Sequence, residues 1–404
     1  MIRMNTPHQL TSRLHFALYS AVVLSFFLQA LTWGGAYRFF AYLVLLLGVG
    51  VYFQAPQQSQ HDRNIILKCL LPLAGFAALE WIATLHFPWD VKAVRHVLLA
   101  TGLLTGIVLM AREHTRIKPY VVPTLIFAVY AYTLFQVVWI YGLEHTYGGT
   151  TKNPHYLAIY SALFLVVATF LVANWSRGLH RYGLVVSAAV LGLLLLHTSS
   201  RPTWIALMLA TLIAVVCLRS RAKLYLIAAA GLIFAVLFFT DVGNFKTRMD
   251  DLVIHASTEE RVTIWEDTWA MQQHSSRQQW LLGHGVEGFE KDFQPYSRYY
   301  ATQGITYNSP HNAILEVLYL FGLVGLTIVL GFILWLYYAL FSRYFKARHQ
   351  TIDGVGMIIL LLLTLLTVTL VAVSITLPFF ISINLNVIGL VMGVMFYLDR
   401  QEKV

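Results

Sequence analysis

Three residues carry groups that could do chemistry at a membrane surface: His311, Arg201 and Arg261. The guanidinium fork of arginine pairs bidentately with phosphate oxygens, so it suits a phosphate or a pyrophosphate. A histidine with the ordinary pKa of about 6.5 can take a proton from a hydroxyl group. Together these groups predict group transfer from a polyprenyl-pyrophosphate donor to a hydroxyl at the outer face of a membrane.

Other chemistries find little support in the sequence. The outer loops hold few carboxylates, so a paired-carboxylate glycosidase site is not evident. No cluster has the ligand count of a catalytic metal site, so we expect no metal and no cofactor. The stretch Gly283–Gly288 formally matches G-x-G-x-x-G, but no buried strand precedes it, and we expect a tight loop there.

His311 stands where a polar loop ends at Pro310 and an apolar run begins. Because proline is tolerated in the first turn of a helix, we expect His311 in or just above the first turn of a membrane helix. An ionisable residue there indicates a functional site. The alternative is an interfacial histidine that caps the helix or reaches water. A spacing of 3.6 residues predicts one shared face, made of His311, Leu315, Leu318, Gly322 and Gly325.

Supporting residues are expected around these three. Asn312 and Glu316 lie on the face next to His311, although helix capping and hydrogen bonding explain both. Ser200 precedes Arg201 in a short corner, where a guanidinium needs an anionic partner, either a protein carboxylate or a lipid phosphate. Lys152 lies in a glycine-rich outer loop that could touch an anionic or sugar ligand, or that simply forms a tight turn.

The helix that should carry Arg261 begins at a capping box. Ser257 and Glu260 have the spacing of this motif, which predicts a helix to about Gln273. Arg261 lies one turn before Trp265 and could face the same cleft, although a solvated helix with a surface arginine is the alternative. The apolar stripe, made of Val262, Trp265 and Trp269, predicts a helix along the membrane interface.

Composition predicts an all-α polytopic membrane protein. The chain is 58% hydrophobic and only 12% charged, whereas soluble domains carry roughly 25% charged residues. We expect about 12 transmembrane helices in a single integral membrane domain, 1–404. They lie near 15–33, 36–54, 65–87, 93–111, 120–141, 155–174, 183–199, 202–218, 224–241, 311–341, 354–376 and 382–398.

The short loops predict the orientation of these helices. Most of their lysines and arginines fall on the side of the N-terminus, so we expect both termini in the cytoplasm. The long hydrophilic loop, 242–310, then lies outside. The net charge of +9 reflects this topology and some attraction to anionic membrane lipids. It is not the footprint of a nucleic-acid-binding protein, because the basic residues are scattered.

The chain resembles the O-antigen ligase family, whose superfamily includes O-antigen polymerases and protein O-oligosaccharyltransferases. The segment Pro310–Glu316 with Gly322 and Gly325 is similar to H-N-x-x-L-E/Q followed by G-x-x-G. Gly283 to Phe289 resembles a G-x-G-x-x-x-F loop. Further similarities are a T/S-x-S/T-R corner at Ser199-Ser200-Arg201, an R-x-x-x-W helix start at Arg261 and Trp265, and an N-P-N turn in which His155 replaces the last asparagine.

This resemblance implies a metal-independent glycosyltransferase of the GT-C type in the bacterial inner membrane. Its donor would be undecaprenyl-pyrophosphate-linked O-antigen and its acceptor the lipid A–core oligosaccharide, at the periplasmic face. Arg201 and Arg261 would hold the pyrophosphate, and His311 would activate or orient the acceptor hydroxyl. Direct displacement would invert the anomeric centre.

Two alternatives remain at this point. The first is another superfamily enzyme with the same donor, either an O-antigen polymerase or a protein O-oligosaccharyltransferase. The second is a twelve-span transporter, which predicts two similar halves with helices broken at matching positions. The sequence shows no such symmetry, because its one long loop lies in the second half.

Overall fold

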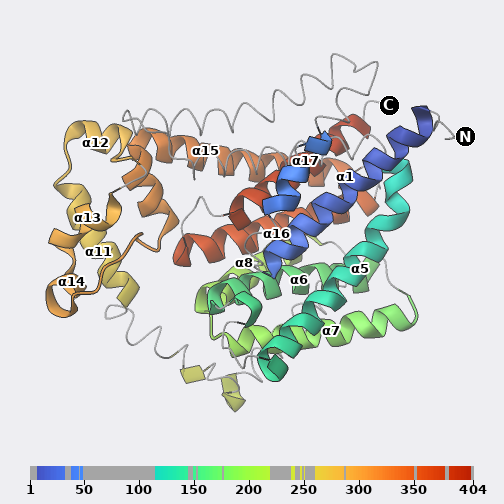
Figure 1. Ribbon diagram of the computed structural model, residues 1–404, viewed down its shortest axis with the longest axis horizontal. Coiled ribbons are helices and arrows are strands. Elements are labelled where there is room, and N and C mark those ends of the chain that lie inside the picture. Colours follow the sequence, from blue (N-terminus) through green and yellow to red (C-terminus); the bar gives the residue numbers. More distant parts are fainter. Residues whose placement is uncertain are drawn as a thin grey trace, which may run out of the picture.

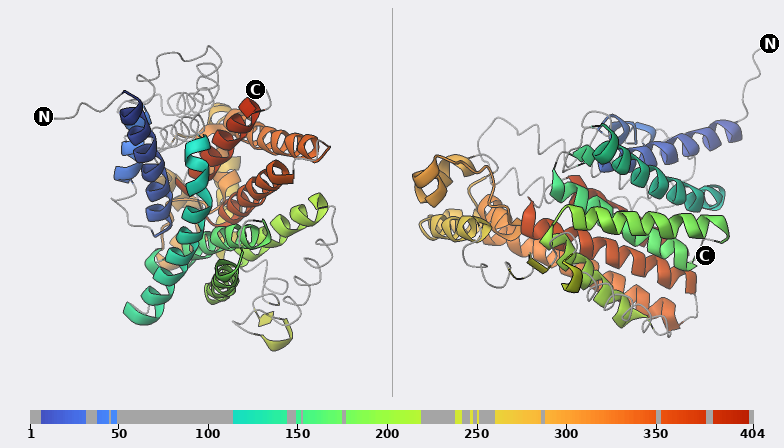
Figure 2. Two further views of the ribbon diagram at one scale, coloured as in Figure 1. Left: turned by 90° about the vertical axis from the view of Figure 1, so that its right-hand side faces the viewer. Right: turned by 90° about the horizontal axis from the view of Figure 1, so that it is seen from below.

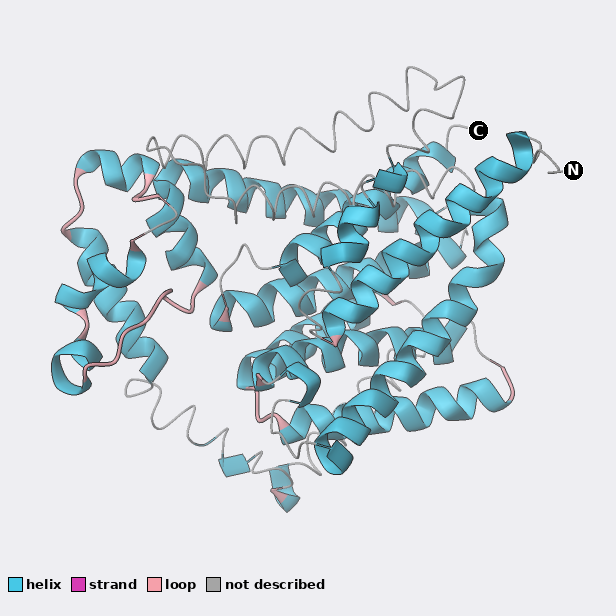
Figure 3. Ribbon diagram, viewed as in Figure 1, coloured by secondary structure: helices cyan, strands magenta, loops and turns pink. Residues whose placement is uncertain are grey.

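In the computed structural model, the described residues form helices and connecting turns, and no strand occurs among them (Figure 3). The expected spans 65–87 and 93–111, most of 224–241, parts of 36–54, the cap residue Ser257 and the site candidate Lys152 lie outside the described residues. The description covers residues 7–31, 38–44, 46–48, 114–143, 149–151, 153–174, 177–218, 238–241, 246–247, 250, 260–285, 288–349, 353–377 and 382–401.

Most of the long helices lie side by side in one bundle (Figures 1 and 2). Their bounds are α1 Pro7–Ala30, α5 His114–Val138, α6 Pro154–Asn174, α7 Leu179–His197, α8 Arg201–Cys217, α15 Ala313–His349, α16 Asp353–Thr376 and α17 Ser382–Gln401. Helices α5, α6, α7, α15 and α16 are long and apolar enough to cross a membrane. These five confirm expected spans, and the total of twelve stays a prediction.

Helix α16 runs through the centre of the bundle. It packs on α6, α8, α15 and α17, and Leu360, Leu363, Leu366 and Val368 are fully buried. A helix that is apolar on all sides belongs in such a position. The buried threonines of α16, such as Thr367, donate their hydroxyls to carbonyls of the preceding turn, so these polar groups are satisfied within the helix. The helix ends at Thr376, where its last carbonyls face the region of His311.

The spacing predicted one continuous helix face from His311 to Gly325, but helix α15 is broken at Gly322. Gly322 has φ 62° and ψ −165°, so Ala313–Phe321 and the remainder of α15 run in different directions (Figure 1). The expected shared face from His311 to Gly325 is therefore wrong beyond Leu318. The expected span 311–341 lies almost entirely within the apolar stretch Ala313–Ala347, which continues a few residues further.

The loop after α12 (Arg277–Leu282) fills this break. The amides of His284 and Gly285 donate to the carbonyls of Tyr319 and Leu320, at 2.7 and 3.1 Å. A Cβ at Gly322 would overlap the backbone of Leu281, and a Cβ at Gly283, whose φ is 86°, would overlap the backbone of Leu320. Gly322 thus lets the end of α12 approach closely, and Gly283 to Gly285 form part of the tight loop expected from the sequence.

This packing predicts a large difference between two glycines of one helix. Gly322→Ala is expected to destabilise the protein by about 2–5 kcal/mol, because the side chain meets backbone and a positive φ is unfavourable for alanine. Gly331→Ala is the control: a Cβ there meets nothing within 4 Å, and alanine favours the helix. The midpoint of thermal unfolding in detergent measures both. Equal midpoints for the two variants would contradict the proposed packing.

Four short helices gather beyond one end of the bundle: α11 Glu260–Gln273, α12, α13 Phe289–Phe293 and α14 Arg298–Gln303 (Figure 1). The start of α1 and the end of α17 lie towards the other end. Helix α11 ends at the predicted residue, and the side that it packs against the protein is not its apolar stripe. Ile264, Asp267, Thr268 and Met271 are buried, whereas Trp269 is 44% exposed. Ile264 and Met271 pack with Phe289, Phe293 and Tyr319.

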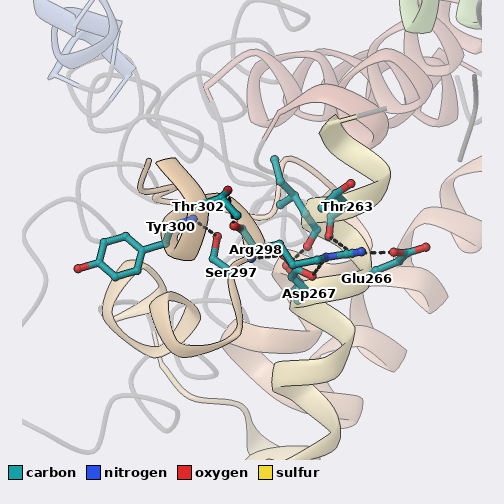
Figure 4. A network of polar contacts seen from close by, with 9 residues as sticks. Thr263, Glu266, Asp267, Ser297, Arg298, Tyr300 and Thr302 are labelled. Carbon is teal, nitrogen blue, oxygen red and sulfur yellow. Dashed lines mark hydrogen bonds and ion pairs between the residues drawn. The ribbon is translucent and has the colours of Figure 1, made fainter. Parts of the chain in front are cut away.

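Arg298, at the start of α14, forms ion pairs with two carboxylates of α11 (Figure 4). The buried carboxylate of Asp267 accepts hydrogen bonds from the backbone amide and from Nε of Arg298, at 2.9 and 2.7 Å. Nη2 of Arg298 donates to Glu266, at 2.6 Å. The two carboxylates, first of all that of Glu266, raise the pKa of Arg298. This arginine therefore positions the segment that leads to His311.

Asp267 is expected to matter more than Glu266, because it is buried and accepts two hydrogen bonds. Asp267→Asn leaves one of its two donors without an acceptor and should cost about 1–3 kcal/mol. Glu266→Gln changes an exposed pair, which typically contributes only about 0–1 kcal/mol. Thermal unfolding and the rate of proteolysis within 260–310 would measure both. A larger effect from Glu266→Gln would contradict this ranking.

Candidate active site

His311 lies directly above α15, as one of the few non-glycine residues with positive φ, 50°. A ring nitrogen donates to the backbone carbonyl of Thr376, and the ring of Tyr307 meets the imidazole edge to face at 6.2 Å. In the neutral ring the other nitrogen must then be the acceptor. A hydrogen bond from one ring nitrogen to this carbonyl would leave the other nitrogen free to accept a proton.

Burial and a neighbouring charge keep this imidazole neutral. Burial lowers the pKa of His311 most, and the positive charge of Arg261 lowers it further. The hydrogen bond to Thr376 and the carboxylate of Glu260 act in the opposite direction but do not outweigh them. His311 is therefore in its proton-accepting form at neutral pH.

Asn312 and Glu316 follow His311 at the start of α15. The side chain of Asn312 accepts hydrogen bonds from the amides of Ile314 and Leu315, at 3.0 and 3.1 Å, so it caps α15. Glu316 is half-buried in the first turn, where a negative charge favours the helix dipole. Of the two explanations left open by the sequence, capping accounts for Asn312.

Arg261 reaches the bundle through a histidine of α6. Its Nη2 lies 2.7 Å from Nε2 of His155, whose Nδ1 lies 3.3 Å from Oγ of Ser200. Since a guanidinium only donates, Nε2 is the acceptor and Nδ1 carries the proton that Ser200 accepts. Ser200 is fully buried and also meets the hydroxyl of Thr203, at 3.1 Å. This chain of polar contacts fixes the direction of Arg261.

Arg201 stands at the first position of α8, next to Ser200. The corner before it is tight: Ser199 has φ 50°, and the amide of Arg201 donates to the carbonyl of Ser199. Pro202 opens the helix, as expected. The half-buried guanidinium of Arg201 is thus carried by the same corner that accepts the proton of His155.

Trp265 lies one turn after Arg261 and is half-buried, and its buried Nε1 makes no hydrogen bond with the residues that the structure describes. Helix α11 therefore brings both residues of the predicted pair to its inner side. An indole N–H without a partner could donate to a ligand.

The ends of α6, α8, α11, α15 and α16 thus meet at one place. Of the residues predicted from the sequence, His311, Arg261 and Ser200 contact other residues of this site, and Arg201 adjoins it. The sequence indicated neither the contact between His155 and Arg261 nor a role for Glu260 beyond the capping box, and it gave no role to Tyr307 or the Thr376 carbonyl. The departure of His155 from the N-P-N pattern was the one available signal. In the part of the chain that the structure describes, no three histidine, cysteine or acidic side chains gather as metal ligands.

A protein-family model described as O-antigen ligase matches residues 186–330. The match runs from within α7 into α15 and includes Arg201, Arg261, Trp265 and His311. His155 and Lys152 precede it. No curated protein matches the chain.

Proposed function

We propose that the chain is an O-antigen ligase, because residues 186–330 match a family model described as O-antigen ligase. It would move O-antigen polysaccharide from undecaprenyl pyrophosphate to the lipid A–core oligosaccharide. The observation that carries this proposal is that a neutral His311 lies near Arg261, whose guanidinium is held by His155. A proton acceptor beside a fixed cation is what displacement of a pyrophosphate by a hydroxyl requires.

The proposed reaction is a single displacement. The acceptor hydroxyl gives its proton to the free nitrogen of His311, and its oxygen forms a bond to the anomeric carbon of the donor. The bond from this carbon to the pyrophosphate oxygen breaks, and its electron pair leaves with undecaprenyl pyrophosphate, which gains one negative charge. Attack opposite the leaving group inverts the anomeric centre.

The two arginines would stabilise the departing pyrophosphate. Arg261 is already directed by His155, so little side-chain entropy is lost when its fork meets the phosphate oxygens. Arg201 would approach from the corner before α8. Positive charge supplied by these residues makes a metal unnecessary in the proposed mechanism, and no cofactor is needed for a displacement of this kind.

The location of the site supports an orientation. The site lies at the end of the bundle next to α11–α14. The start of α1 and the end of α17 lie towards the opposite end (Figure 1). Together with the lysines and arginines of the short loops, this supports cytoplasmic termini and a periplasmic site in the inner membrane. Donor and acceptor lipids would both reach it from the outer leaflet.

Competition between acceptors would test the proposed activity. Purified protein in vesicles would receive undecaprenyl-pyrophosphate-linked O-antigen together with lipid A–core oligosaccharide, a second donor molecule and a pilin-type protein. We expect labelled glycan on the lipid A–core. Elongated lipid-linked glycan would instead make the chain a polymerase, and labelled protein would make it a protein O-oligosaccharyltransferase.

A further inference from the structure

Glu260 and Arg261 are neighbours in sequence with opposite charges, and both act on His311. Arg261 disfavours the charged imidazolium, whereas the carboxylate of Glu260 favours it. Arg261 is held by His155. Glu260 is held by a different residue, the phenol of Tyr307, which donates a hydrogen bond to Oε1.

Tyr307 connects this carboxylate to the histidine. Its hydroxyl binds Glu260, while its ring packs edge to face against His311 and, on another side, against Tyr299 at 6.0 Å and Phe293 at 6.4 Å. These three ring contacts restrict the orientation of Tyr307, whose hydroxyl is directed to Glu260. Burial and the carboxylate raise the pKa of Tyr307, so the phenol stays protonated and remains a donor.

We propose that Glu260, held in place by Tyr307, is a positioning residue that stabilises the imidazolium of His311 during transfer. This proposal rests on the proposed function, in which His311 accepts the proton of the acceptor hydroxyl. A positive imidazolium beside Arg261 is unfavourable, because like charges repel. The carboxylate offsets that repulsion at the moment when the proton moves.

The other groups around His311 do not replace this carboxylate. His155, on α6, is neutral, because Nε2 accepts from Arg261. The Thr376 carbonyl, at the end of α16, and the Tyr307 phenol are dipoles without net charge. Among the described groups that act electrostatically on His311, Glu260 is the one with a negative charge. The pyrophosphate, which is proposed to bind Arg261, would add a second negative charge to the site.

The test is a pH profile of transfer with Glu260→Gln, which keeps the shape and removes the charge. We expect kcat to fall about 10- to 100-fold with little change in KM for the donor. Removing a negative charge lowers the pKa of His311, so the acid limb of kcat/KM should move to lower pH. Glu260→Asp keeps the charge and should restore part of the rate and the position of the limb.

Glu290→Gln is the matched control, because Glu290 is an exposed carboxylate on α13. It should leave both kcat and the acid limb unchanged. If Glu260→Gln does not fold, Tyr307→Phe tests the proposal instead, because it removes only the hydroxyl that holds Glu260. A lower kcat with an unchanged donor KM would support the proposal. Wild-type kinetics would overturn it.

The outcomes separate this inference from the proposed function. A wild-type protein that transfers no glycan overturns the function itself. A wild type that transfers and a His311→Ala variant that does not would uphold the function. If Glu260→Gln then shows wild-type kcat and an unmoved acid limb, the role of Glu260 alone is overturned.

Discussion

Replacing His311 by alanine is expected to lower kcat by about 10²–10⁴-fold, while the affinity for the donor changes little. The imidazole is half-buried, oriented by the Thr376 carbonyl and neutral, so it has one nitrogen ready to accept a proton. Alanine removes the proton acceptor but leaves Arg261 and its partner in place. Single-turnover transfer and equilibrium binding of the lipid-linked donor would measure the two effects separately.

His274→Ala is a suitable control for this variant. His274 is an exposed histidine after the end of α11, and its Nδ1 contacts the carbonyl of Ala270. Its loss should not alter kcat. Equal rates in the His311→Ala and wild-type proteins would remove the proton acceptor from the proposed mechanism, although the enzyme class would stand.

The direction of the His311 pKa gives the pH dependence. His311 must be neutral to accept a proton, so activity falls as pH drops through its pKa. Because burial and Arg261 lower this pKa from 6.5, activity should persist below pH 6.5 and be lost at lower pH. An acid limb of kcat/KM above 6.5 would contradict the environment described for His311.

The second large effect is expected from Arg261. Arg261→Ala removes charge-assisted hydrogen bonds to the pyrophosphate, each worth roughly 1.5–3 kcal/mol, and so should lower kcat/KM by about 10- to 150-fold. It also leaves Nε2 of His155 without its donor. Arg261→Lys keeps the charge but not the fork, and it should recover only part of the loss. Titration with a labelled pyrophosphate lipid and steady-state transfer would show both effects.

Arg261→Ala should also shift the pH profile in a direction that a general loss of structure would not produce. Removing the positive charge raises the pKa of His311, so the acid limb should move to higher pH, opposite to the shift expected for Glu260→Gln. Arg277→Ala, on the exposed side of α12, is the control and should behave as wild type. If Arg261→Ala and Arg277→Ala weakened donor binding equally, Arg261 would not be the pyrophosphate ligand.

Much of the site could be predicted because its residues stand at element ends. His311 follows a proline and precedes an apolar run, and Arg261 opens a helix that ends at Gln273 as expected. Such positions are set by local signals, namely caps, prolines and hydrophobic length. Five long apolar helices were recognisable for the same reason.

What the sequence did not predict depends on contacts between distant segments. Arg261 and His155 are 106 positions apart, and nothing in either stretch specifies the other. The Thr376 carbonyl is backbone, which leaves no signature in residue type. The break at Gly322 was read as a smooth helix face, because the amides that satisfy its carbonyls come from the loop after α12.

The buried face of α11 shows the same limit. The packed face of α11 carries Asp267 and Thr268, which are polar and which hydrophobic spacing did not indicate. Asp267 can be buried because Arg298 returns from α14 to neutralise it. A pattern based on hydrophobicity alone cannot include a buried residue whose partner lies 31 positions further along the chain.

The most direct test of the account is release of undecaprenyl pyrophosphate from purified wild-type protein in vesicles, with EDTA present. The vesicles would contain the O-antigen donor and lipid A–core oligosaccharide, and both products would be counted. We predict equal amounts of released undecaprenyl pyrophosphate and of glycosylated lipid A–core, with inverted anomeric configuration. Intact donor that moves across the bilayer without cleavage would contradict a transferase and indicate a transporter.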